Sequence, residues 1–227
     1  MKGRFWVIEG LDGCGKSTQL ELLRAALEER GIRLKYIHFP MLNQGVYGEL
    51  VAEFLRGEYG SLETVHPKLV ALLFANDRRE HADTIRHWLD EGYHVLADRY
   101  VYSNIAFQCA KLVSEEERRR LKEWILDFEF GVNSLPRPDK SFFLNVPFGF
   151  IERSLSQRRV GEDRDYLNGK EDIHEQSLEL QRQVYDVYQS LLAERDDLVS
   201  IDCSDGENRF LPKEEIHRRI LREMEER

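Results

Sequence analysis

The sequence predicts one α/β domain built on a five-stranded parallel sheet with helices on both faces. Short apolar runs alternate along the chain with stretches of helical period, which is typical of parallel sheets whose crossovers are helices. The apolar runs are nearly continuous, as expected of strands buried on both faces. No repeat, linker or low-complexity tract divides the 227 residues, a length that a single core can accommodate.

The predicted strands are short runs rich in apolar, aromatic and β-branched residues. Gly10 follows the first run and Pro40 ends the second, and both residue types interrupt regular secondary structure. In the third run, Asp98 closes an apolar segment. The predicted strands cover residues 4–9, 34–39, 94–98, 141–146 and 198–203.

Helical periodicity fills the segments between the strands. Gly31 and Gly92 stand where two of the helices should end, and Ser114 is a favourable N-cap residue. Residues 157–172 are almost wholly polar and interrupt the alternation. The expected helices cover residues 18–30, 46–56, 67–91, 102–111, 115–130, 175–194 and 212–226, and another begins near residue 147.

Composition and charge narrow the class of partner. The net charge is −9, from 33 basic and 42 acidic side chains. Because proteins that bind duplex nucleic acid usually carry a positive surface, we expect no nucleic-acid partner, although a small phosphorylated ligand needs only a few local cations. The N-terminal residues lack a signal-peptide pattern and no apolar run approaches membrane-spanning length, so we expect no membrane partner. Cys14, Cys109 and Cys203 are scattered and fit reduced thiols in a cytoplasmic protein.

The stretch GLDGCGKS, residues 10–17, matches the phosphate-binding pattern G-x-x-x-x-G-K-[ST] between a predicted strand and a predicted helix. Glycines let backbone N–H groups converge on one anion, and the positive end of the following helix reinforces them. Lys16 supplies a cation for the β- and γ-phosphates, and the Ser17 hydroxyl ligates Mg²⁺. A purely structural turn is the alternative. The residues expected to bind the triphosphate are Gly10, Leu11, Asp12, Gly13, Cys14, Gly15, Lys16, Ser17 and Thr18.

A phosphate-binding loop does not by itself define a reaction. Switch GTPases need a base-reading N-K-x-D tetrapeptide, which is absent from the sequence, and large motor ATPases need a longer chain. A small kinase remains, and it requires an acceptor site.

Two segments are candidates for that acceptor site. Asp98-Arg99-Tyr100 follows the third strand, at the edge where open α/β sheets bind ligands. Arg99 can hold phosphate through its planar fork of donors, or it can form a salt bridge with Asp98. Phe74 and Arg78 share one helical face, where a ring and a cation can bind the same ligand. Alternatively, Phe74 belongs to the core.

Together these segments resemble the thymidylate kinase family. The resemblance implies a three-layer P-loop nucleoside monophosphate kinase fold over residues 1–227, with a mobile lid at about 157–172. It also implies phosphorylation of dTMP to dTDP with ATP and Mg²⁺, and a homodimer joined through the helices at 46–56 and 67–91. The matching segments are EGLDGCGKST at 9–18, HFP at 38–40, LLFANDR at 72–78, DRYVYSNIAFQCAK at 98–111 and RRVGEDRDY at 158–166.

The resemblance also implies roles for individual residues. Asp12 would accept a hydrogen bond from the 3′-hydroxyl of dTMP, and Phe74 would stack on thymine. Arg99 would bridge the acceptor phosphate and the transferring phosphoryl group. Phe107 would pack where a 2′-hydroxyl would clash. Other contacts to the base and the pocket wall would come from Arg78, Asn104, Ser103, Gln108 and Pro40.

The transferring phosphoryl group needs an arginine nearby. Some family members carry it in the phosphate loop directly after the aspartate, where this chain has Gly13. The polar segment contains Arg158, Arg159 and Arg164 instead, which resembles the bacterial type with arginines in the lid. Tyr166 in the same segment would reach the acceptor base. The resemblance therefore implies a catalytic set of Lys16, Arg99, Arg159 and Arg164.

One further departure from the family pattern concerns the pair that follows Phe39-Pro40. The family often has an arginine there, and this chain has Met41 and Leu42. Arg78 and Arg99 would then supply more of the contact with the acceptor phosphate.

Two other functions stay open from the sequence. A deoxynucleoside kinase would need a carboxylate base near a 5′-hydroxyl group, and the segment 98–111 argues against it. A nucleotide-binding regulatory module without turnover would not need transition-state cations, and the retained arginines argue against that. Dependence of ATP turnover on a nucleoside monophosphate discriminates among the three.

Overall fold

The computed structural model describes residues 2–42, 44–62, 64–156, 174 and 177–225, and confirms the predicted parallel sheet. The five strands run in the order β2-β3-β1-β4-β5, and every adjacent pair is parallel. Each strand lies within one residue of its predicted bounds: β1 (Phe5–Glu9), β2 (Leu34–His38), β3 (His94–Asp98), β4 (Lys140–Asn145) and β5 (Leu198–Asp202).

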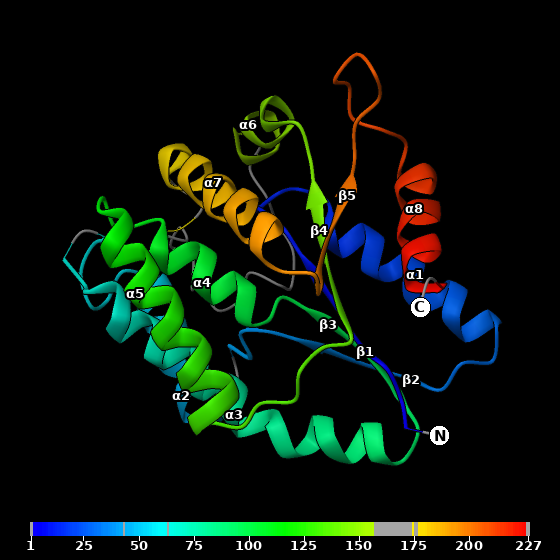
Figure 1. Ribbon diagram of the computed structural model, residues 1–227, viewed down its shortest axis with the longest axis horizontal. Coiled ribbons are helices and arrows are strands. Elements are labelled where there is room, and N and C mark those ends of the chain that lie inside the picture. The colour runs from blue at the N-terminus through cyan, green and yellow to red at the C-terminus, as the bar shows by residue number, and fades with distance from the viewer. Residues whose placement is uncertain (1, 43, 63, 157–173, 175–176, 226–227) are drawn as a thin grey trace.

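Helices cover both faces of this sheet and make three layers. In Figure 1, α1 and α8 lie together on one side, and α4, α5 and α7 lie on the other, while α2 packs against α3. The helices are α1 (Lys16–Glu29), α2 (Gly45–Leu55), α3 (Pro67–Asp90), α4 (Val101–Cys109), α5 (Glu115–Leu126), α6 (Phe148–Ser156), α7 (Leu178–Glu194) and α8 (Lys213–Glu225).

The predicted helix over residues 115–130 is different in the structure. Its regular part ends at Leu126 as α5, and a π-helical segment, η1 (Asp127–Val132), follows. The wider turn carries Glu129, whose side chain is fully buried. Periodicity alone could not find this break, because a π-helical turn contains the same residue types as an α-helix.

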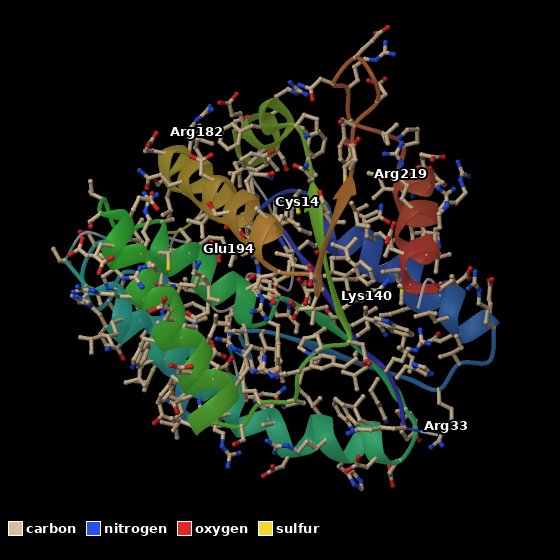
Figure 2. All side chains as sticks on the ribbon, in the orientation of Figure 1. Cys14, Arg33, Lys140, Arg182, Glu194 and Arg219 are labelled. Atoms are coloured by element: carbon tan, nitrogen blue, oxygen red, sulfur yellow. The ribbon has the colours of Figure 1, made fainter. Side chains whose placement is uncertain are left out.

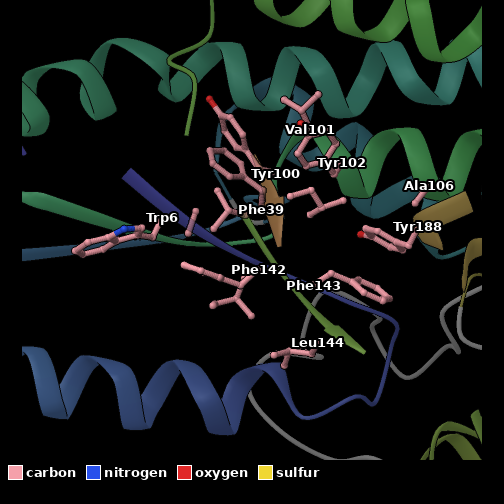
Figure 3. Packing of buried hydrophobic residues seen from close by; sticks show 14 of the residues in the cluster. Trp6, Phe39, Tyr100, Val101, Tyr102, Ala106, Phe142, Phe143, Leu144 and Tyr188 are labelled. Atoms are coloured by element: carbon pink, nitrogen blue, oxygen red, sulfur yellow. The ribbon is translucent and has the colours of Figure 1, made fainter. Parts of the chain in front are cut away.

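The core lies on both faces of the strands. Along β4 the side chains alternate, so Phe142 and Leu144 face the α1 side while Phe143 stacks on Tyr188 of α7 at 4.4 Å between ring centroids (Figure 3). Tyr100, which directly follows β3, is also buried and packs edge-on against Phe5. This packing anchors Tyr100, the second residue after the carboxyl end of β3, which is where the site lies.

Many charged side chains lie on the surface. Figure 2 shows Arg33 and Arg182 projecting from the outside of the molecule, whereas Cys14 lies inside, beside β4. None of the helices in the described part of the chain is long and apolar enough to cross a membrane.

Candidate active site

A cavity of about 160 Å³ opens at the carboxyl edge of the sheet, where β1, β2 and β3 end. Open α/β sheets bind ligands at this edge. The cavity joins the phosphate loop to α3 and α4. The residues expected from the sequence that line it are Asp12, Lys16, Ser17, Pro40, Phe74, Arg78, Arg99, Ser103, Asn104, Phe107 and Gln108.

The phosphate loop has the backbone that its glycines allow. Gly13 and Gly15 have φ angles of +74° and +90°, a region that side chains rarely tolerate. An added Cβ at Gly13 would lie 2.7 Å from the Ser154 hydroxyl of α6. Lys16 is buried and its Nζ donates to the carbonyl oxygen of Leu11 at 2.9 Å. The Lys16 ammonium group therefore lies inside the phosphate loop, where it is hydrogen-bonded to the backbone.

Arg99 connects the loop to α4. Its Nη1 donates to the carbonyl oxygen of Gly10 at 2.9 Å and to Ser103 Oγ at 3.1 Å, and its Nη2 donates to Asp12 Oδ1 at 2.5 Å. The guanidinium lies over the Phe107 ring, 5.1 Å from its centroid. Arg99 has a φ of +64°, and such strain at a non-glycine residue clusters at functional sites. The left-handed turn is what aims this side chain back across the loop.

Asp12 is held by Gln181 of α7 as well as by Arg99. Gln181 Nε2 of α7 donates to Asp12 Oδ2 at 2.7 Å, and the Asp12 N–H donates to Gln181 Oε1 at 3.2 Å. Burial alone would raise the pKa of Asp12, but Arg99 and Lys16 outweigh it and the pKa is lowered. Asp12 is therefore an ionised acceptor in the cavity.

A buried carboxylate, Glu9, holds residues that neighbour Arg99. Glu9, at the end of β1, accepts hydrogen bonds from the Tyr100 N–H at 3.0 Å, from Ser103 Oγ and from the Tyr188 hydroxyl at 2.9 Å. Burial raises its pKa although these donors and Arg99 oppose the shift. Glu9 thus fixes the turn that carries Arg99.

The structure does not contain the alternative salt bridge between Asp98 and Arg99. Its Oδ2 lies 3.1 Å from His38 Nδ1, while Arg99 pairs with Asp12. Burial raises the pKa of Asp98, but His38 and the nearby cations reverse the shift and lower it. The other oxygen, Oδ1, is buried and has no hydrogen-bond partner among the described residues. That oxygen is available to a cation or its water ligands.

The end of the cavity next to α3 contains a second buried ion pair. Arg78 donates from Nε and Nη2 to the two oxygens of Glu129 at 2.6 and 2.7 Å, and both side chains are almost fully buried. Asn104 Nδ2 also donates to Glu129, at 2.8 Å. Asn104 Oδ1 is buried without a partner in the described part of the chain. This leaves an amide oxygen able to accept from a ligand in the cavity that Phe74 also lines.

Sequence reasoning missed several residues of this site. Glu129, Gln181 and His174 all touch residues that line the cavity, yet each lies far along the chain from the motif it supports. Their patterns are those of ordinary helical or polar residues. The one signal in the sequence for Glu129 is its place in a mainly apolar stretch, WILDFEF, where a glutamate is uncommon.

A model of the thymidylate kinase family matches residues 8–220. The chain belongs to the thymidylate kinase family. Its members are phosphotransferases with a phosphate group as acceptor, and convert dTMP to dTDP. The chain is 34% identical over 224 residues to the thymidylate kinase of Plasmodium falciparum, covering 98% of this chain and 90% of that one. It is 36% identical over 191 residues to that of Mycobacterium tuberculosis H37Rv, covering 82% and 85%. The thymidylate kinase structure from Candida albicans has a TM-score of 0.71 at 24% identity, covers 99% of this chain and 92% of that chain, and shows the same fold.

The structure bears on the departures from the thymidylate kinase pattern. The Met41 N–H donates to the Asp77 carboxylate, 3.2 Å from each oxygen, and Leu42 lines the cavity. The position of Gly13 lies against Ser154, as above. Four other residues that the sequence predicts for the site, Arg158, Arg159, Arg164 and Tyr166 of the segment 157–172, lie outside the described residues.

Proposed function

We propose that the cavity binds dTMP beside the phosphate loop and that the protein transfers the γ-phosphoryl group of ATP to it, forming dTDP and ADP. One observation supports this most strongly. Arg99 touches both the phosphate loop and α4, so a single cation stands between the donor and acceptor ends of one cavity. Membership of the thymidylate kinase family identifies the acceptor.

At the donor end, the loop amides and the start of α1 would hold the phosphates of ATP. Lys16 would exchange its bond to the Leu11 carbonyl for the β- and γ-phosphate oxygens. Preorganised donors of this kind stabilise charge that develops in the transition state.

The residues present fit Mg²⁺. Ser17 lines the cavity at the start of α1, and Asp98 presents a buried oxygen that no described residue satisfies. No group of three or more acidic, histidine or cysteine side chains in the described ranges forms a self-sufficient metal site. This suits an ion that is bound mainly by phosphates and water. When bound, Mg²⁺ neutralises charge on the β- and γ-phosphates. Ser17 would supply the direct ligand and Asp98 would orient water.

At the acceptor end, Phe74 would stack on thymine, and Asn104 and Arg78 would bind its polar edge. Asp12, whose carboxylate already accepts from Arg99 and Gln181, keeps lone pairs for the 3′-hydroxyl of dTMP. Phe107 would exclude a 2′-hydroxyl. A phosphate oxygen of dTMP is ionised near neutral pH, so the transfer needs no general base. Ser103, Gln108 and Pro40 complete the wall.

The remaining transition-state charge would fall to Arg159 and Arg164, with Arg158 as a further candidate and Tyr166 near the base. Gly13 supports this proposal, because the loop position itself cannot carry a side chain without displacing Ser154. We expect that Arg159→Ala and Arg164→Ala lower kcat, and that only the residue that contacts the transferred group lowers it by about 10³-fold.

We also propose a homodimer that forms through α2 and α3, in the cytoplasm. Val46 on α2 and Leu69 on α3 are 66% and 60% exposed, and they place two apolar side chains on the surface of helices that pack together. All three cysteines are unpaired and buried, as suits a reducing compartment. Sedimentation of the wild type and of Leu69→Glu tests the dimer, which the charge should dissociate.

The experiment that tests the function is an assay of ADP release with ATP and Mg²⁺ against dTMP, dUMP, dCMP, AMP and thymidine. We expect dTMP to be turned over far faster than the others, and Lys16→Met to abolish turnover. Faster turnover of thymidine would contradict the acceptor assignment and favour a deoxynucleoside kinase. ATP binding without any turnover would favour a regulatory module.

A further inference from the structure

His174 is a buried side chain of the cavity that the mechanism above does not use. It is 6% exposed and lies three residues before Ser177, which caps α7. Its ring lies nearly parallel to that of Phe74, at 14° and 6.4 Å between centroids, and nearly parallel to that of Phe107, at 27° and 5.1 Å. His174 is thus grouped with the two rings expected to contact the nucleoside of the acceptor.

Polar contacts to Gln181 and Lys111 help to hold this histidine in place. Its carbonyl oxygen accepts from Gln181 Nε2 at 3.2 Å, and the same amide nitrogen donates to Asp12. Its ring Nε2 lies 3.1 Å from Lys111 Nζ. Because an ammonium group only donates, Nε2 must accept, and the single proton of the neutral ring is on Nδ1. Burial and the nearby Lys111 hold the pKa of His174 well below its usual value, although Asp12 opposes the shift.

We propose that His174 is the second wall of the acceptor-base slot, so that the pyrimidine ring lies between the rings of Phe74 and His174. This rests on the proposed function and deepens it. Two flat rings that hold a third between them stand about 7 Å apart, which is twice a contact of about 3.5 Å. The ring centroids of Phe74 and His174 are 6.4 Å apart and the rings are nearly parallel, so the pyrimidine would enter as the two rings move apart. A neutral imidazole suits the slot, because stacking on an uncharged base does not require burying an unpaired charge.

A ring in this position could instead block the slot, and measurements of dTMP binding distinguish a wall from a block. If His174 forms a wall, removing the ring weakens dTMP binding. If the ring instead blocks the slot, removing it strengthens dTMP binding. The sign of the change therefore decides.

The test compares His174→Ala and His174→Phe with the wild type, by calorimetric titration of dTMP without ATP and by KM values for both substrates. Loss of one stacked ring should raise the Kd and KM for dTMP about tenfold in His174→Ala. His174→Phe restores the ring and should stay within about threefold of the wild type. The KM for ATP should be unchanged in both. His87→Ala, at an exposed position of α3, is the control and should match the wild type.

An unchanged or lower Kd for dTMP in a folded His174→Ala protein would overturn the proposal. The wild type provides a test that needs no variant, because a stacked pyrimidine shifts the ring proton resonances of His174 upfield when dTMP is added. Absence of that shift on a protein that binds dTMP would also overturn it. Failure of the proposed function itself looks different, since the wild type would then not turn over dTMP at all.

Discussion

The two ends of the cavity are built in different ways. The proposed donor end comes from one continuous segment, residues 10–18, and Lys16 is held by carbonyl groups of that same segment. The proposed acceptor end is assembled from α3, α4, η1 and His174, and its central polar contact joins Arg78 to Glu129, 51 residues apart. A local motif can be recognised from its letters alone, whereas an assembled wall depends on the whole fold. Substitutions at the donor end should therefore alter chemistry, and those at the acceptor end should alter both binding and stability.

Outside the phosphate loop, the largest effect is expected at Arg99, which belongs to both ends. Arg99→Ala should lower kcat by about 10³-fold, because no other described side chain bridges the loop and α4 in the same way. Arg99→Lys keeps the charge but loses the planar fork, so it should recover only part of the rate. Steady-state kinetics measure both. A kcat within tenfold of the wild type for Arg99→Ala would place the bridging cation elsewhere.

Substitutions at the acceptor end should lower the free energy of unfolding more than substitutions at the donor end. Glu129→Ala leaves the Arg78 guanidinium buried without its carboxylate, and such a loss destabilises proteins by about 3–5 kcal/mol. Urea unfolding measures the change. The matched control is Glu123→Ala, which breaks the exposed pair with Arg119 on α5 and should change the free energy of unfolding by less than about 1 kcal/mol. Similar values for the two variants would show that the buried pair does not hold the wall together.

A smaller effect, dependent on pH, is expected where α3 meets the loop after Pro40. Burial raises the pKa of Asp77 to about 6 from 3.8, although Arg78 and the Met41 N–H oppose the shift. The folded protein therefore binds this proton more tightly than the unfolded chain does, and the resulting stability, complete below pH 3.8, is lost as the pH rises through about 6. Asp77→Asn does not titrate. Its free energy of unfolding should gain on the wild type by about 2–3 kcal/mol between pH 4 and 7. A difference that is independent of pH would contradict the raised pKa.

The same contrast explains what the sequence could predict. Gly13 and Lys16 follow a pattern whose backbone and chemistry are local, so the loop and its strand–helix context were predictable. The parallel sheet was predictable because buried strands are continuous apolar runs. The break between α5 and η1 was not, since it depends on burying Glu129 against Arg78. Gln181 gave no signal either, because its contact with Asp12 forms only once α7 packs beside the loop.

The most direct test of two separate ends is the pair of variants Phe74→Ala and Lys16→Met, with Kd values for dTMP and ATP measured in each. Phe74→Ala should weaken dTMP binding by about tenfold and leave ATP binding unchanged, because it removes one stacking partner of the acceptor base. Lys16→Met should weaken ATP binding and leave dTMP binding unchanged. If Phe74→Ala weakened ATP binding as much as dTMP binding, Phe74 would not be part of a separate acceptor wall.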